Sequence, residues 1–290
     1  MRTAEQMLEL ILSTAREDER IRGVCLEGSR TNPNAPADLF QDFDVMYVVG
    51  ETASFQQDKS WIDRFGERLY MQYPEDHPVY PSDRAHCYGW LMQFADGNRL
   101  DLHVSTLDWV LEHDAKDSLF TVLLDKDGLF PHRKPADDSA HWVKKPDQAL
   151  FSAECNEFWW CLNNFCKGLW RQEISYAQWV MNDLLRPQLL QVLSWKAAIP
   201  HDFHISVGKC GKYLPKFLEK SLWEGYLSTY CGADSGEMWA AGETLCALFH
   251  QTAQQVAQQL DFVYDEQEAR NSWGFFRHVR DLPRDAKEIF

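Results

Sequence analysis

The sequence predicts an α+β protein in two parts, an N-terminal domain with a mixed sheet and a C-terminal domain that is an all-helical bundle. Before about residue 127, short runs of alternating apolar residues, typical of strands, are interspersed with helical segments. From residue 147 onward apolar residues recur at helical spacing and strand signals are few. Between them, residues 128–146 carry three prolines and many charges, which is typical of a connection. We therefore expect domains at 1–135 and 136–290.

The N-terminal domain is expected to begin with a helix and to continue mainly in strands. Thr3 and Gln6 have the spacing of a capping box, and apolar residues follow them at helical intervals. Periodicity and turn signals predict strands at 24–26 and 43–49, a helix at 60–70, and a hairpin at 88–95 and 99–105 around Asp96-Gly97-Asn98.

The C-terminal domain is expected to consist of long helices. Helical periodicity predicts helices at 154–171, 174–198, 215–230 and 236–260. Pro187 should kink or divide the second of these, because proline removes a backbone hydrogen bond and clashes with the preceding turn. The last ten residues, 281–290, form a charged tail.

Two aspartates on a predicted strand carry the strongest chemical signal. Asp42 and Asp44 are one residue apart, so both side chains project from the same face while the apolar residues between and after them enter the core. Magnesium prefers one or two carboxylates with phosphate oxygens, and paired ions can hold the attacking and leaving oxygens of an in-line displacement. Upstream, Gly28 lets the backbone approach a phosphate, Ser29 offers a hydroxyl, and Arg30 could neutralise phosphate charge.

A third carboxylate lies in the predicted hairpin. In its second strand the leucines beside Asp101 share one face, and Asp101 projects from the other. It could complete a metal site or act as a general base, and the sequence leaves both roles open. The alternative for all three aspartates is a solvated strand position, because Asp-x-Asp pairs are common in a chain with 44 acidic residues.

The helical part combines aromatic and acidic side chains that could bind a cationic substrate. A carboxylate beside an indole face is a suitable contact for a guanidinium or ammonium group. The candidates are Glu154, Glu157, Trp159 and Asp183. The alternative is that the tryptophan belongs to the core and the acids are solvated, as most such residues on helices are.

These motifs resemble those of a known superfamily. Gly28-Ser29, Asp42-x-Asp44 and a later strand aspartate resemble the polymerase-beta-like nucleotidyltransferases. Longer blocks resemble the aminoglycoside 6-adenylyltransferases, the streptomycin-modifying enzymes. They cover almost the whole chain, at 18–22, 26–30, 40–44, 71–76, 100–102, 123–127, 155–159, 167–169, 186–187 and 206–209.

The resemblance implies an ATP-dependent enzyme with two Mg²⁺ ions that transfers AMP to a hydroxyl, at position 6 of streptomycin or a related aminoglycoside, and so gives antibiotic resistance. It also implies that Ser29 and Lys209 steady the leaving pyrophosphate. The chain departs from the family at 77–79, 103–105 and 178–180, which leaves the acceptor open. The alternatives are another small antibiotic, a protein acceptor, or a non-catalytic nucleotide-binding module.

Charge and composition restrict the partners. A formal net charge of -15 would repel nucleic acid and suits a polycationic small molecule. No apolar run of 18 residues exists, so a membrane span is not expected. The eight cysteines show no Cys-x-x-Cys spacing, and a zinc site is therefore not expected. With a helix in place of a signal peptide, these features lead us to expect a cytoplasmic monomer.

Overall fold

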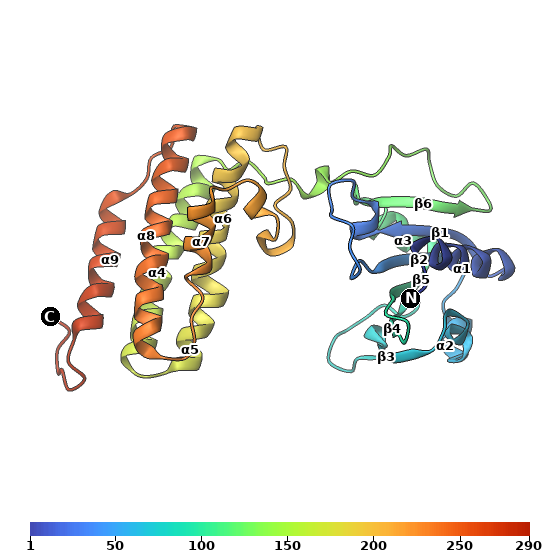
Figure 1. The fold of residues 1–290 in the computed structure, drawn as a ribbon, viewed down its shortest axis with the longest axis horizontal. Coiled ribbons are helices and arrows are strands. Elements are labelled where there is room, and N and C mark those ends of the chain that lie inside the picture. Colours follow the sequence, from blue (N-terminus) through green and yellow to red (C-terminus); the bar gives the residue numbers. More distant parts are fainter. The chain divides into compact units, whose positions relative to one another are not determined.

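The computed structural model describes residues 1–290 and divides the chain into two compact units, Met1–Ala140 and His141–Phe290. Figure 1 draws the first unit in blue to green and the second in green to red. The first unit is built on a mixed sheet and the second is helical, which confirms the expected fold class.

The sheet has six strands in the order β3-β4-β5-β2-β1-β6. Its strands are β1 (Ile21–Glu27), β2 (Phe43–Val49), β3 (Arg68–Gln72), β4 (Cys87–Phe94), β5 (Arg99–Thr106) and β6 (Phe120–Asp125). β2 and β5 run parallel at the centre, and the other neighbouring strands pair antiparallel. The strand at 43–49 and the hairpin around Gly97 are therefore confirmed.

Short helices flank the sheet. They are α1 (Ala4–Glu17), α2 (Ala53–Gln57) and α3 (Leu107–His113), with 3-10 turns η1 (Gly28–Thr31), η2 (Trp61–Phe65), η3 (Pro74–Asp76) and η4 (Ser139–His141). The expected capping box at the start of α1 is present, because Thr3 Oγ1 accepts from the Gln6 N–H and the Gln6 side chain accepts from the Thr3 N–H.

The prediction of a helix at 60–70 is wrong. The structure has only the 3-10 turn η2, followed directly by strand β3. Trp61, Ile62 and Phe65 are buried in the structure. Over a single turn, the spacing of these apolar residues also fits a helical pattern. Gly66, with a φ of +121°, ends the turn and lets the chain extend to pair with β4.

The two faces of the sheet differ in character. The larger core lies on the face that α1 covers, where the Tyr47 hydroxyl donates to the Ile11 carbonyl at 2.7 Å. It contains Phe43, Val45, Tyr47 and Val49 of β2 with Leu100, Leu102 and Val104 of β5. A smaller cluster around Met46 and Val48 packs with Val110 of α3 on the opposite face. The intervening residues of β2 and β5, including both strand aspartates, project from this second face.

The second unit is a bundle of helices. They are α4 (Gln148–Trp170), α5 (Ile174–Trp179), the π-helical segment η5 (Val180–Leu185), α6 (Arg186–Ala198), η6 (Ile199–His201), η7 (Lys209–Gly211), η8 (Leu214–Lys216), α7 (Lys220–Leu227), α8 (Ser235–Leu260) and α9 (Glu266–Asp281). The helix predicted at 174–198 is divided before Pro187, which stands in the first turn of α6. Of the region predicted as a helix at 215–230, only residues 220–227 are α-helical, and the sequence did not predict α9.

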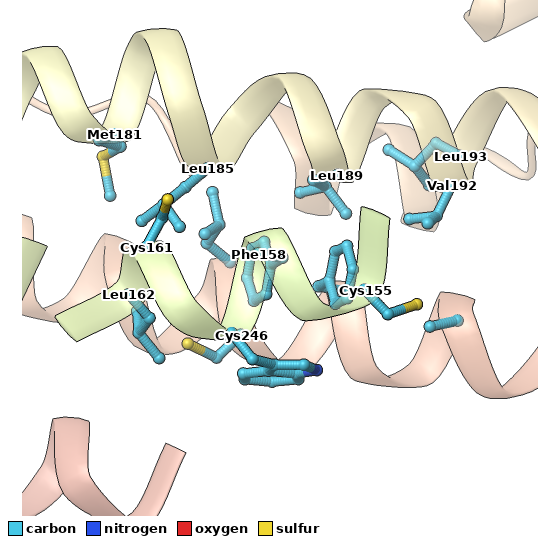
Figure 2. Close-up of a cluster of buried hydrophobic side chains, with 14 of the residues drawn as sticks. Cys155, Phe158, Cys161, Leu162, Met181, Leu185, Leu189, Val192, Leu193 and Cys246 are labelled. Carbon is cyan, nitrogen blue, oxygen red and sulfur yellow. The ribbon is translucent and has the colours of Figure 1, made fainter. Parts of the chain in front are cut away.

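The core of this bundle is aromatic and tightly stacked. Phe158 of α4 lies parallel to Phe249 of α8, with ring centroids 3.7 Å apart. Figure 2 shows Phe158 and Leu162 of α4 between Leu189 of α6 and Cys246 of α8. None of the helices combines the length and apolar character needed to cross a bilayer.

Candidate active site

Two central strands bring three carboxylates together. Asp44 of β2 and Asp101 of β5 are aligned partners across the parallel pair, and Asp42 immediately precedes β2. Their donor oxygens all lie within 4.8 Å of one another, and all three residues are partly buried. The alternation of side chains on a strand thus produces the juxtaposition that the sequence predicted. We call these three residues the carboxylate triad.

A tight turn lies directly against the triad. Gly28, at the start of η1, has a φ of +67°, and a Cβ added there would lie 2.4 Å from the Asp44 Oδ2 atom. Only glycine therefore permits both this backbone conformation and this close approach. The Thr31 hydroxyl donates to the Gly28 carbonyl at 2.9 Å and closes the turn, which places the half-buried Ser29 within it.

Arg30 holds the segment that leads into β2. Its Nε donates to the Asp42 carbonyl at 2.7 Å and its Nη2 donates to the Gln41 carbonyl at 2.6 Å. The guanidinium also lies 3.6 Å from the centroid of the Phe43 ring, a cation–π contact. These contacts fix the backbone of Asp42, and so they orient the first carboxylate of the triad.

Arg99 is a site residue that the sequence did not single out. Its Nε and Nη2 donate to the two carboxylate oxygens of Asp101 at 2.9 and 2.6 Å, and its Nε lies 3.9 Å from an Asp42 oxygen. Arg99 and Asp101 are two residues apart on β5, so they share a face, and this spacing could have revealed the pair. The guanidinium balances part of the negative charge of the triad.

Glu27 adds a fourth carboxyl group beside the triad. It lies opposite Asp44 in the antiparallel pairing of β1 and β2, so Glu27, Asp44 and Asp101 form a row across three neighbouring strands. Burial, together with Asp114 and Asp44, raises the pKa of Glu27 to about 8. Burial and the charges of Asp42 and Asp101 raise the pKa of Asp44 to about 6. Carboxyl groups are therefore concentrated on this face of the sheet, and the protonated form of Glu27 is favoured.

The donor set of the triad suits a hard cation. Three carboxylates on adjacent positions offer only oxygen ligands, which Mg²⁺ and Mn²⁺ prefer. Burial first, and then the charges of Asp42 and Asp101, raise the pKa of Asp44, and a bound cation would offset both effects by favouring the ionised carboxylate. The residues present therefore fit magnesium.

The candidate acceptor residues of the helical unit have different surroundings. Trp159 is 2% exposed, and its Nε1 donates to the Tyr264 hydroxyl at 3.0 Å, so it is part of the bundle core. Glu154 is half-buried on α4, whereas Glu157 and Asp183 are exposed. Glu157 accepts a weak hydrogen bond from a cysteine one turn later in α4.

Lys209 is exposed at the first position of η7. The preceding Gly208 has a φ of +70°, and a Cβ there would lie 2.7 Å from the Tyr213 ring. Glycine therefore gives this loop its tight course and leaves the lysine at the surface.

Comparisons with known proteins identify the family. The family model for streptomycin adenylyltransferase matches residues 1–279. The chain is 40% identical over 264 residues to the aminoglycoside 6-adenylyltransferase of Campylobacter jejuni, covering 91% of each protein.

Further relatives agree in name. The aminoglycoside 6-adenylyltransferase of Bacillus subtilis (strain 168) is 37% identical over 267 residues, covering 92% of this chain and 94% of the relative. A crystal structure of an aminoglycoside 6-adenyltransferase from Bacillus subtilis matches 97% of this chain and 100% of that chain, at 31% identity and a TM-score of 0.48. On the family model and the sequence relatives, the chain belongs to the streptomycin adenylyltransferase family.

Proposed function

We propose that this chain transfers AMP from ATP to the 6-hydroxyl of streptomycin or a related aminoglycoside, which gives resistance to the drug. The observation that carries the proposal is the convergence of the carboxylate triad beside the turn at Gly28. Family membership supports the reaction type and the class of acceptor.

The triad would hold two Mg²⁺ ions, with Asp42 and Asp44 as ligands and Asp101 as a third ligand or as the group that accepts the proton of the acceptor hydroxyl. Bound magnesium supplies positive charge to the phosphate oxygens as negative charge develops on them. The acceptor oxygen forms a bond to the α-phosphorus, the bond from the α-phosphorus to its bridging oxygen breaks, and pyrophosphate leaves. Catalysis then depends mainly on positioning and charge stabilisation.

The turn and two cationic side chains would bind the triphosphate. Gly28 allows the backbone to approach a phosphate, and Ser29 offers its hydroxyl and N–H. Arg30, besides holding the backbone at Asp42, and Lys209 would neutralise phosphate charge. Arg99 balances part of the charge of the triad, and we propose that it turns to a phosphate oxygen once a metal ion is bound.

The helical unit would supply the acceptor contacts. We propose Glu154, Glu157 and Asp183 as contacts for the cationic groups of the drug, with Trp159 supporting α4 around them. A formal net charge of -15 favours the approach of a polycation. The roles of the two domains, the monomeric state and the cytoplasmic location stay predictions.

A pyrophosphate-release assay tests the proposal. With ATP and Mg²⁺, we expect release with streptomycin and none with kanamycin or lincomycin. Asp44→Asn, which keeps the size of the side chain but removes the charge, should lower the rate by on the order of 10²–10³-fold because charge stabilisation is lost. The same change at the exposed Asp63 is the matched control and should leave the rate unchanged.

Three other outcomes of this assay would contradict part of the proposal. Release with kanamycin or lincomycin alone would assign a different acceptor. ATP binding without release on any acceptor would contradict an enzymatic function and favour a nucleotide-binding module. Full activity of Asp44→Asn would remove the metal assignment.

A further inference from the structure

A second group of metal-binding side chains lies on the same face of the sheet as the triad. It consists of Glu75 of η3, Cys87 of β4 and His103 of β5, whose donor atoms all lie within 4.8 Å of one another. His103 is two residues beyond Asp101 on β5, and Cys87 lies opposite Ser105 of the same strand, so the side chains of Asp101, His103 and Cys87 share one face.

A glycine makes room for this cluster. Gly89 lies opposite His103 in the β4–β5 pairing, and a Cβ added to it would lie 2.3 Å from Cδ2 and 2.5 Å from Nε2 of the imidazole. The ring can therefore lie against the β4 backbone only because residue 89 has no side chain. The Gly89 N–H donates to Glu75 Oε2 at 2.8 Å, which fixes the carboxylate and leaves its other oxygen, Oε1, 3.8 Å from His103 Nε2.

The donors differ in kind from those of the triad. A thiol, an imidazole and a carboxylate together are the ligand types of zinc and similar transition metals, whereas Mg²⁺ takes oxygen ligands. In a tetrahedral zinc site with ordinary bond lengths, neighbouring donor atoms are about 3.3–3.6 Å apart. The observed 3.8 Å between His103 Nε2 and Glu75 Oε1 thus needs a closure of only about 0.5 Å. Three protein ligands leave one position for water.

We propose that Glu75, Cys87 and His103 form a binding site for a zinc-class transition metal ion, distinct from the magnesium site at the triad. The spacing of the cysteines did not predict it, because the three ligands come from separate segments that only the sheet brings together. The bound ion ties η3 to β4 and β5 beside the triad. The proposal does not depend on adenylyl transfer, since it uses neither ATP nor an acceptor.

Two measurements on the full-length protein test this site. The first is titration with Co²⁺, monitored by the charge-transfer absorption of a cobalt–thiolate bond. The second is alkylation of each cysteine with and without Zn²⁺, mapped by peptide mass spectrometry. We expect one cobalt–thiolate site per chain and protection of Cys87 by Zn²⁺ but not by Mg²⁺. The exposed Cys210 should be alkylated equally in both conditions.

Single substitutions test which residues bind the metal ion. Cys87→Ser should abolish the cobalt–thiolate absorption, and His103→Asn should weaken Zn²⁺ binding by about tenfold or more. Cys210→Ser is the matched control and should bind as the unmodified protein does. Unchanged alkylation of Cys87 in the presence of Zn²⁺ would overturn the proposal even if a variant failed to fold. Absorption that survives Cys87→Ser and disappears in Cys210→Ser would overturn it as well.

Discussion

The sheet unit and the helical unit use their large and charged side chains in opposite ways. In the sheet unit, Glu27, Asp44 and Asp101 are partly buried in one row, and the pKa values of the first two are raised to about 8 and about 6. In the helical unit, Trp159 is buried in the core, and Glu157 on the same helix is exposed. Both groups of side chains that could hold a metal ion lie in the sheet unit, and the helical unit has none. Raised pKa values in a cluster of carboxylates are typical of a functional site.

The difference implies different effects of substitution. Removing a core side chain such as Trp159 should cost about 3–5 kcal/mol of stability, because a cavity replaces packed aromatic contacts. Changing a residue of the triad should cost activity while stability is retained or increased, since like charges repel there. Loss of activity with retained stability is therefore the expected signature of substitutions in the triad.

After Asp44→Asn, the largest loss of activity is expected from Gly28→Ala. The new methyl group would meet the Asp44 carboxylate, and the positive φ adds about 1–2 kcal/mol of backbone strain. A displaced Asp44 should lower the rate of pyrophosphate release by on the order of 10²-fold. Gly50→Ala is the matched control, because a Cβ there meets no atom within 4 Å. Equal rates for the two variants would contradict the geometric role of Gly28.

The contrast also separates what the sequence could predict from what it could not. The strand of Asp44 and the hairpin of Asp101 follow from local patterns, a period of two and an Asp-Gly turn. Glu27 lacks such a signal, because its place beside the triad depends on which strands are neighbours and in which register. The pair of Arg99 and Asp101 has a local signal, the two-residue spacing on one strand. The pattern around Trp61 predicts a helix because three apolar residues fit either period over so short a distance, and the structure has only a 3-10 turn there.

Arg99→Gln should separate metal binding from catalysis. The arginine competes with a metal ion for Asp101 and Asp42, and as a half-exposed ion pair it contributes up to about 1 kcal/mol. Its removal should tighten Mn²⁺ binding by about two- to fivefold, measured by electron paramagnetic resonance. The turnover number should fall by about tenfold, because a cation for the phosphates is lost. Weaker Mn²⁺ binding in the variant would show that Arg99 organises the triad instead of competing with metal.

Metal binding should depend on pH through Asp44. Its pKa is raised from 3.8 to about 6, and a metal ion binds the ionised carboxylate. Affinity for Mn²⁺ should therefore be full above pH 6 and fall by about tenfold for each pH unit below it. Without metal, the free energy of unfolding changes with pH in the opposite direction to metal affinity. The reason is that the folded state holds more protons than the unfolded state between pH 3.8 and 6. The Asp44 contribution to stability should thus decrease as pH rises through this window.

Two titrations check these signs. Mn²⁺ binding measured from pH 5 to 8 should show the loss at low pH, and Asp44→Asn should bind more weakly with a flatter profile. Affinity that stays constant from pH 5 to 7 would show that the carboxyl of Asp44 titrates well below pH 5.

The smallest expected effect concerns the helical surface. Glu157 is exposed, so an ion pair between it and a cationic group of the drug is worth only about 0.2–1 kcal/mol. Glu157→Gln should therefore raise the KM for streptomycin by up to about fivefold, while the KM for ATP and the melting temperature stay unchanged. Glu224→Gln, at an exposed position on α7, is the matched control. If the two variants behave alike, this part of α4 does not contact the drug, and other residues must provide the acceptor contacts.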